Sequence, residues 1–364
     1  MASITIEKES VGISDTDREL EELLQKQGAR IKVIGCGGGG GNSVSRMKET
    51  GIKGCEIIAI NTDAQDLLYS TADAKILIGR ELTHGLGAGS NPKIGEQAAR
   101  ESEQEIRKKI GDVDMVFITC GLGGGTGTGS GPVVAELAKK QGALTIGVVT
   151  LPFTVEGQKR IENAQYGLER MAAIADTLIV IPNDKLLEIA PELPIHTAFK
   201  VADEILTNSV KGITELVTKA GLVNLDFADV KAVMSNGGVS LIGIGESDSK
   251  DRARDSVEKA INNPLLDVDI TNATGVLVNI VGGPDMSLDE YRLVMEIIGE
   301  KVAPDAKIIS GAQISPDMEK TMKVLLIVTG VKSSQIIGSS TVLTEKNSSF
   351  LEKELGIDFL KEQI

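Results

Sequence analysis

The sequence has few residues of the kinds that hold metal ions or form disulfides. It contains three cysteines, Cys36, Cys55 and Cys120, in no CxxC pair, and two histidines, His84 and His196, far apart. These numbers argue against a structural zinc site and against a disulfide framework, and we predict no metal site built from protein side chains. Cys36 and Cys120 fall at the ends of expected strands, where a small buried apolar side chain is the plainer interpretation.

The sequence also lacks a membrane segment and a recognisable signal peptide. The longest uncharged apolar stretch, residues 142–155, is too short to cross a bilayer, and the N-terminal residues show no signal-peptide pattern. Lys and Arg number 38 against 52 Asp and Glu, which gives a formal net charge of −14. An acidic balance argues against general affinity for nucleic acid or anionic lipid. We therefore expect a cytoplasmic protein with no membrane span and no nucleic-acid partner.

Glycine, in contrast, is abundant: 41 of the 364 residues are glycine, or about 11%, whereas the average in proteins is about 7%. Sixteen of the 41 fall in three short segments, residues 35–41, 85–89 and 121–131. Glycine concentrated in this way indicates backbone that approaches another group closely or that adopts a positive φ angle.

The first half of the chain has the pattern of a parallel sheet covered on both faces. Six apolar strands are expected at residues 30–34, 56–60, 75–78, 114–119, 144–151 and 177–181. Helical patterns lie between them, at residues 92–109, from the third glycine segment to 140, and at 156–173. Alternation of this kind predicts a doubly wound α/β domain.

The second half is a smaller α/β unit that follows a long helix at about residues 197–219. Four strands are expected at residues 239–245, 276–281, 307–313 and 324–331, with helices at 250–262 and 287–301. Length alone favours two domains. We divide the chain into a polar N-terminal extension with a short helix from Asp15 (1–29), a parallel-sheet domain (30–195), a central connecting helix (196–220), a C-terminal α/β domain (221–332) and a serine-rich, flexible tail (333–364).

The first glycine segment follows a strand and precedes a helix, which is typical of a phosphate-binding site. Gly35, Gly37 and Gly40 satisfy the G-x-G-x-x-G pattern, and Asp63 stands where a ribose-binding acid of a dinucleotide site would be. A Rossmann-type nicotinamide-dependent oxidoreductase is therefore one interpretation.

The third glycine segment favours a nucleoside triphosphate instead. It also lies between a strand and a helix, and a dinucleotide site needs only one such segment. The sequence contains no G-x-x-x-x-G-K-[ST], so it is not a P-loop protein. Tight strand–helix packing is the alternative explanation for glycine-rich turns.

Several motifs together resemble the tubulin/FtsZ superfamily of GTPases, and within it the prokaryotic cell-division branch rather than the longer eukaryotic tubulins. They are Gly35-Cys36-Gly37-Gly38-Gly39-Gly40-Gly41-Asn42, Asn61-Thr62-Asp63-Ala64-Gln65, Gly87-Ala88-Gly89-Ser90-Asn91-Pro92, Gly123-Gly124-Gly125-Thr126-Gly127-Thr128-Gly129 and Asn224-Leu225-Asp226-Phe227-Ala228-Asp229-Val230. The resemblance covers about residues 30–331, in order. It implies a tubulin-like fold: an N-terminal GTP-binding domain, a long central helix and a C-terminal domain with mostly four strands.

The resemblance also implies a set of nucleotide-binding residues. They are Gly37, Gly38, Gly39, Gly40, Gly41, Asn42, Asp63, Gly124, Gly125, Thr126, Gly127, Thr128, Glu156, Arg160, Asn183, Phe199 and Asp203. Glu156 and Arg160, expected four apart on one helical face, would lie near the ribose and phosphates, although alone they would be a surface ion pair. Asn183 and Asp203 would read guanine, with Phe199 beside the base. A carboxylate at Asp203 can accept from both N1–H and the exocyclic amino group of guanine, a pair of donors that adenine lacks.

The same resemblance assigns catalysis to Asn224, Asp226 and Asp229. In the family, the segment after the central helix reaches the nucleotide of the next subunit, so the hydrolytic site forms between stacked subunits. Hydrolysis needs a group that orients the attacking water, and head-to-tail contacts that do not close produce filaments. The structural alternative is that these acids cap a helix that starts near Phe227.

From the resemblance we expect a GTP-dependent, filament-forming GTPase of the cell-division ring, located at mid-cell. Its ligands would be GTP and GDP, with Mg²⁺ held mainly by phosphate oxygens and water, and its main partner would be itself, in a head-to-tail homopolymer. A membrane-anchoring adaptor bound by residues 350–364 is a further expected partner, although this segment matches the family only loosely. Besides the oxidoreductase, a nucleotide-binding filament protein with little hydrolysis remains an alternative.

Overall fold

The structure is a computed structural model that describes residues 29–189, 195–218, 221–223, 225–266 and 270–331. The helix expected from Asp15 and the tail segments expected after residue 332 lie outside these residues. None of the described helices is both long enough and apolar enough to cross a membrane.

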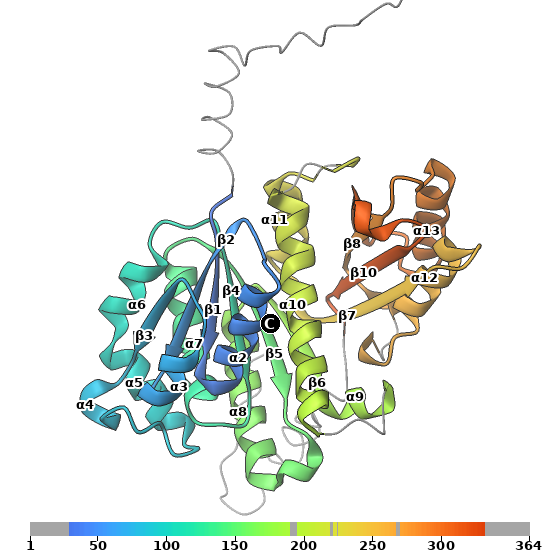
Figure 1. Ribbon diagram of the computed structural model, residues 1–364. Coiled ribbons are helices and arrows are strands. Elements are labelled where there is room, and N and C mark those ends of the chain that lie inside the picture. Colours follow the sequence, from blue (N-terminus) through green and yellow to red (C-terminus); the bar gives the residue numbers. More distant parts are fainter. Residues whose placement is uncertain (1–28, 190–194, 219–220, 224, 267–269, 332–364) are drawn as a thin grey trace, which may run out of the picture.

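A single ten-stranded sheet runs through the molecule in the order β3-β2-β1-β4-β5-β6-β7-β10-β8-β9 (Figure 1). The strands are β1 Ile31–Cys36, β2 Cys55–Asn61, β3 Ala74–Leu77, β4 Met115–Gly121, β5 Leu144–Leu151, β6 Thr177–Pro182, β7 Gly238–Ser247, β8 Gly275–Gly282, β9 Lys307–Ile314 and β10 Met322–Thr329. All pairs from β3 to β7 are parallel, whereas β10 is antiparallel to both of its neighbours. The ten predicted strands are all present.

Helices cover both faces of the sheet, as the continuous apolar strands predicted. The residues of the two buried clusters assign each helix to a face. One face carries α5 Pro92–Glu101, α6 Glu103–Ile110, α7 Thr126–Lys140, α8 Gln158–Ile174, α12 Arg252–Ile261 and α13 Leu288–Lys301. The other carries α2 Gly37–Glu49, α3 Ala64–Tyr69, α9 Asn183–Ile189, α10 Ile195–Thr218 and α11 Phe227–Met234.

Two helix predictions were wrong in detail. The helix expected at residues 92–109 is interrupted at Ser102, which ends α5 and precedes α6 and whose hydroxyl accepts a hydrogen bond from the Gly79 N–H. The helix expected from residue 156 begins at Gln158, because Gly157 has φ 102° and separates it from the 3₁₀ turn Thr154–Glu156.

The long helix α10 lies beside the C-terminal half of the sheet and packs against α2, with α11 near its far end (Figure 1). The sheet continues from one half of the chain to the other through the β6–β7 pair. The division into separate domains therefore stays a prediction, because a continuous sheet is compatible with one domain or with two.

Several glycines are present because neighbouring backbones leave no room for a side chain. A Cβ on Gly40 would lie 2.5 Å from the Thr119 carbonyl oxygen, and one on Gly129 would lie 2.0 Å from the Pro92 carbonyl oxygen. These contacts join α2 to β4 and α7 to α5. The packing explanation of the glycine-rich segments thus holds for part of them.

We predict that Gly129→Ala lowers the free energy of unfolding by about 1–3 kcal/mol, because the new methyl group overlaps backbone that cannot retreat. Gly299→Ala is the matched control, since Gly299 is also within a helix and a Cβ there meets nothing within 4 Å. This control is expected to be neutral or stabilising by about 1 kcal/mol, from the higher helix propensity of alanine. Urea unfolding of the three proteins measures the difference, and equal effects at both positions would contradict the packing explanation.

Candidate functional site

The strand order changes direction between β1 and β4, and a cavity lies at the carboxyl ends of these two strands. These neighbouring strands are parallel, but α2, after β1, and α7, after β4, lie on opposite faces of the sheet. In open α/β sheets, ligands bind at the carboxyl ends of the strands at such a switch point. The cavity has a volume of about 600 Å³. The strand order β3-β2-β1-β4-β5-β6 also occurs in dinucleotide-binding folds, so topology alone leaves both predicted ligands open.

The first glycine segment belongs to a helix rather than to a loop. Strand β1 runs to Cys36, and α2 begins directly at Gly37, with φ 71°. Gly38, Gly39 and Asn42 line the cavity. No side chain caps this helix N-terminus and its first turn contains no acid, so its N–H groups and its dipole favour an anion.

The third glycine segment brings a second helix N-terminus to the same cavity. Gly124, Gly125, Thr126 and Gly127 line it, and α7 begins at Thr126, again with no side-chain cap and no acid in the first turn. Two uncapped helix N-termini that face one cavity suit a ligand with several phosphate groups better than a pyrophosphate that needs one.

Four of the residues predicted to bind nucleotide are not among those that line the cavity, namely Gly37, Gly40, Gly41 and Thr128. Gly40 lies against β4, as described above. The buried Thr128 hydroxyl accepts a hydrogen bond from the Gly123 N–H at 2.9 Å, which holds the turn in front of α7. These residues shape the wall from behind.

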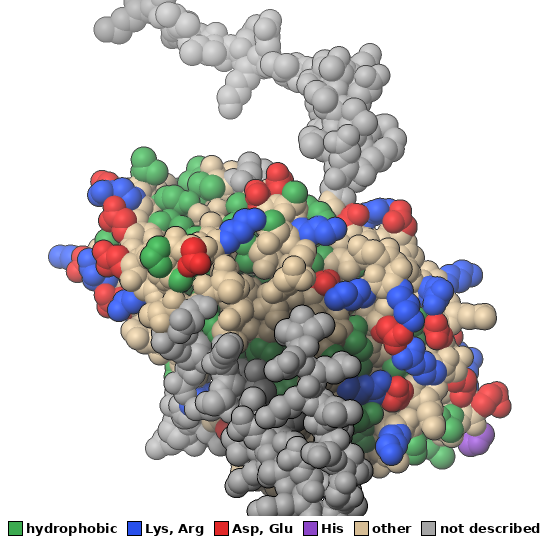
Figure 2. Space-filling view, turned by 180° about the vertical axis from the view of Figure 1, so that it is seen from behind, with side chains coloured by type: hydrophobic (Ala, Val, Ile, Leu, Met, Phe, Trp, Pro, Cys, Tyr) green, Lys and Arg blue, Asp and Glu red, His purple; other side chains and the backbone are tan. Residues whose placement is uncertain are grey.

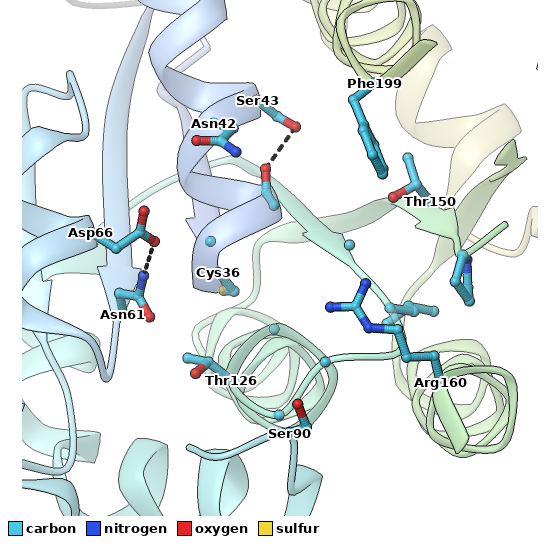
Figure 3. Close-up of a pocket in the computed structure, with 18 of the residues that line it drawn as sticks. Cys36, Asn42, Ser43, Asn61, Asp66, Ser90, Thr126, Thr150, Arg160 and Phe199 are labelled. Carbon is cyan, nitrogen blue, oxygen red and sulfur yellow. Dashed lines mark hydrogen bonds between the residues drawn. The ribbon is translucent and has the colours of Figure 1, made fainter. Parts of the chain in front are cut away.

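Side chains from β2 and α3 close the cavity on one side (Figure 3). The Asp63 carboxylate lines the cavity and caps α3, accepting hydrogen bonds from the backbone of Gln65 and Asp66. The Asp66 carboxylate in turn accepts a hydrogen bond of 2.6 Å from the Asn61 amide. Gly87 of the second glycine segment and Ser90, which follows that segment, also reach this cavity.

Arg160 is the only lysine or arginine among the described residues that line the cavity, and its guanidinium points inward (Figure 3). It forms an ion pair with Glu156. The prediction that these two residues share a helical face was wrong, because Glu156 ends a 3₁₀ turn and Arg160 belongs to α8, on the other side of Gly157. The pair still lies at the cavity, and the Glu156 carboxylate also accepts a hydrogen bond from the Phe153 N–H.

At the opposite end, α9 and α10 supply Asn183, Phe199 and Asp203. Asn183 is 4% exposed, and its side-chain oxygen has no hydrogen-bond partner within the described part of the chain. An orphaned buried acceptor is costly, so this oxygen is suited to a donor on a ligand. Phe199 is 41% exposed and meets Phe153 edge to face, with ring centroids 5.3 Å apart, which leaves part of its ring available to a planar group.

Asp203 is the carboxylate of this end. Burial raises its pKa above the ordinary range, while a hydrogen bond from the Ser43 hydroxyl, at 2.6 Å, and the charge of Arg46 act in the opposite direction. A carboxylate kept in a half-buried position at a cavity wall is a typical acceptor for ligand N–H groups.

The predicted catalytic acids lie away from this cavity. Asn224 is outside the described residues. Asp226 is exposed and caps α11, accepting a hydrogen bond of 2.8 Å from the Asp229 N–H, and Asp229 is exposed as well. The 24-residue α10 is about 36 Å long, with Asp203 in its first half and Asp226 beyond its end. In the single chain Asp226 therefore caps α11 and Asp229 lies in its first turn, and one chain does not bring either acid to its own cavity.

Sequence reasoning assigned no binding role to Ser43, Asn61, Asp66 and Ser90, although Asn61 and Ser90 belong to motifs that carry the family resemblance. Asn61 ends a parallel strand and could have been found from the rule that such ends line sites. Ser43 carried no signal, because its role depends on a carboxylate 160 residues away.

Cys36 also lines the cavity, but burial raises the pKa of its thiol to about 12. It therefore remains a neutral thiol at physiological pH and is not suited to act as a nucleophile. Cys120 is equally buried, as its position at a strand end predicted.

Comparison with known proteins gives matches over both halves of the chain. The family described as "Tubulin/FtsZ family, GTPase domain" matches residues 30–191, and "FtsZ family, C-terminal domain" matches residues 238–332. "Cell division protein FtsZ 1" of Thermococcus kodakarensis is 59% identical over 94% of this chain and 90% of that protein. The protein of the same description from Archaeoglobus fulgidus is 56% identical over 97% of this chain and 94% of its own length.

Among solved structures, "FtsZ dimer, empty (M. jannaschii)" is similar to this chain with a TM-score of 0.84 at 59% identity. The match covers 88% of this chain and 93% of that chain.

We predict that Asp203→Asn raises the free energy of unfolding of the ligand-free protein at pH 7. A raised carboxyl pKa in the folded state means that stability falls as the pH rises from the ordinary carboxyl value of about 3.9 through the raised one, so the cost is larger at pH 7 than near pH 4. Asparagine removes that cost.

Urea unfolding at pH 7 and near pH 4 checks this, and the gain should shrink at the lower pH. The control is Asp289→Asn, at a side chain 90% exposed, which should change stability little. A loss of stability in Asp203→Asn at pH 7 would show that the charge is not disfavoured by burial.

Proposed function

The chain belongs to the FtsZ branch of the tubulin/FtsZ GTPase family, and from this premise we propose how its described residues bind and hydrolyse GTP. As a member of that branch it is a cell-division GTPase of the tubulin-like cytoskeleton and binds guanine nucleotide. The family identification decides against a nicotinamide-dependent oxidoreductase. The assignment of individual residues to the nucleotide is our proposal.

One observation carries the proposed binding mode: two helix N-termini and a carboxylate wall face a single cavity. The N-termini of α2 and α7 would hold the phosphates through their N–H groups. Asp203 and Asn183 would accept the donors of guanine, and Phe199 would lie against the base. Arg160 would meet the ribose or the phosphates, kept in place by Glu156.

Magnesium is part of this proposal, with its coordination supplied by phosphate oxygens and water. No group of three or more His, Cys, Asp or Glu side chains within the described part of the chain is arranged to hold a metal ion. Asp63 and Asp66 stand at the cavity wall, where their charge would favour a hydrated cation beside the phosphates.

We further propose that hydrolysis occurs between two stacked subunits. The four carboxylates that line the cavity already accept hydrogen bonds that hold its wall: Asp63 from α3, Asp66 from Asn61, Glu156 from Phe153, and Asp203 from Ser43. All four therefore help to hold the wall of the binding site, and we assign none of them to the attacking water. Asp226 and Asp229 are exposed at the other end of α10, where head-to-tail stacking would bring them to the γ-phosphate of a neighbour.

This arrangement explains filament formation and turnover. A heterologous contact between unlike surfaces repeats without closing, so subunits that complete one another's sites form a filament. Loss of the γ-phosphate would remove contacts with the acids of the next subunit and weaken the joint. Self-association is consistent with the dimer described for the M. jannaschii relative.

We predict that Asp226→Asn lowers GTP hydrolysis by about 100-fold or more, the effect expected when a group that positions or deprotonates the attacking water is lost. Asparagine still caps a helix, so α11 is preserved while the charge is removed. Pelleting with GTP should persist. The measurement combines phosphate release with sedimentation, and Asp289→Asn, an exposed acid in the first turn of another helix, is the matched control.

The wild-type protein supplies a second arm of the same experiment. Its specific activity should rise steeply with protein concentration, because sites form only between subunits. Specific activity that is independent of concentration would refute the shared site. Filaments that form while phosphate release stays near background would favour the alternative, a filament protein with little hydrolysis.

The C-terminal segment 350–364, outside the described residues, is proposed to bind a membrane-anchoring adaptor and so to bring the filaments to mid-cell. Its hydrophobic residues Leu351, Leu355 and Phe359 are four apart, which would place them on one side of a helix. We predict that deletion of 350–364 leaves GTP hydrolysis intact and abolishes localisation at the division site, as fluorescence microscopy of a tagged protein would show. Unchanged localisation would refute the adaptor proposal.

A further inference from the structure

Ser43 lies in the second turn of α2, between the cavity and α10. It is 2% exposed and lines the same cavity end as Asp203 and Phe199. Figure 3 shows its side chain directed away from α2 toward the side on which Phe199 lies. A buried hydroxyl at a cavity wall needs a partner, and the choice of partner defines what Ser43 does.

The Ser43 hydroxyl has one hydrogen and two acceptors within reach. The Asp203 carboxylate oxygen Oδ1 lies at 2.6 Å, and the Gly39 carbonyl oxygen lies at 3.0 Å. Bonds from a hydroxyl to an ionised oxygen are short, about 2.5–2.7 Å, and roughly twice as strong as neutral ones. The hydrogen therefore goes to Asp203, and the contact with Gly39 is secondary.

Ser45, two residues further along α2, shows what a serine does there without a carboxylate. Its hydroxyl donates to the Gly41 carbonyl oxygen at 2.7 Å, the usual bond to the preceding turn of a helix, and accepts from the Thr71 N–H. Ser43 departs from this pattern, because its shorter bond leaves its own helix and ends on α10.

We propose that Ser43 is a positioning residue that holds the Asp203 carboxylate in the orientation that reads both donors of guanine. The inference rests on the proposed function and deepens it. A carboxylate has about four acceptor sites on two oxygens, so Oδ1 can accept from Ser43 and from the base at once. With the carboxylate plane fixed, one oxygen meets N1–H and the other meets the exocyclic 2-amino group.

Free rotation of the carboxylate would preserve one of these bonds and weaken the other. Ser43 thus determines specificity through Asp203 without touching the base. The loss of the bond to the 2-amino group can be measured with IDP, whose base, hypoxanthine, is guanine without that group. The quantity that depends on Ser43 is the ratio of the affinities for GDP and IDP, since the two diphosphates differ only in the 2-amino group and neither presents a γ-phosphate to hydrolyse.

The test measures binding of GDP and IDP to the full chain by isothermal titration calorimetry. Ser43→Ala is expected to lower the GDP/IDP affinity ratio about tenfold, the size of one hydrogen bond to a charged group. Ser45→Ala, on the same helix, is the matched control and should leave the ratio unchanged. If Ser43→Ala does not fold, Ser43→Cys carries the same test, because a thiol is a weak donor of similar shape.

A double-mutant cycle separates positioning from a structural effect. In the Asp203→Asn background, Ser43→Ala should leave the GDP/IDP ratio unchanged, since the carboxylate that it orients is gone. Equal losses for GDP and IDP in Ser43→Ala, or a change of ratio that persists without Asp203, would overturn the inference. If the wild-type protein does not prefer GDP to IDP and ADP, the proposed guanine recognition fails instead, and the two failures are thereby distinguished.

Discussion

The close approach of backbones around β1, α2, β4 and α7 is the constraint on which the site depends. A Cβ on Gly35 would lie 2.3 Å from the Gly40 carbonyl oxygen, and one on Gly127 would lie 2.8 Å from the Cys36 carbonyl oxygen. Because these positions carry no side chain, both helices begin directly at the sheet edge and point their N-termini at one volume. A phosphate site made of backbone N–H groups needs the two helix N-termini to lie close together, because an N–H group cannot extend toward a ligand as a long side chain can. The glycines behind the wall are therefore as necessary to the cavity as those that line it.

Much of the fold could be predicted from the sequence, because the strands are short apolar runs between clear helical patterns. The strand predicted at residues 144–151 coincides with β5, and the ten predicted strands are all present. Helix boundaries were less predictable. Ser102 separates α5 from α6, and Gly157 separates a 3₁₀ turn from α8. A single glycine is also tolerated within helices, so the sequence alone did not mark these boundaries.

The site divides in the same way between local and long-range information. The glycine segments predicted the part of the cavity proposed to bind the phosphates, because a helix N-terminus that follows a strand end can be recognised from local sequence. Asn183, Phe199 and Asp203 came from the family resemblance and not from any local pattern, and they do line the cavity. The bond between Ser43 and Asp203 joins residues 160 positions apart, and only the fold brings them together. Figure 2 shows acidic and basic side chains interspersed over one face of the molecule. The net charge of the sequence could not predict this distribution.

The length of α10 has a consequence of its own. This helix carries Asp203 in its first half, and the segment with Asp226 follows its C-terminal end. No loop within the helix can absorb a change in its length. Insertion of one residue into α10 would rotate everything beyond it by about 100° and displace it by about 1.5 Å. The number of residues in the helix thus fixes the distance between its two ends and their relative rotation about the helix axis. We expect length variation in this protein to accumulate in its surface turns, while the count of residues from 195 to 218 stays constant.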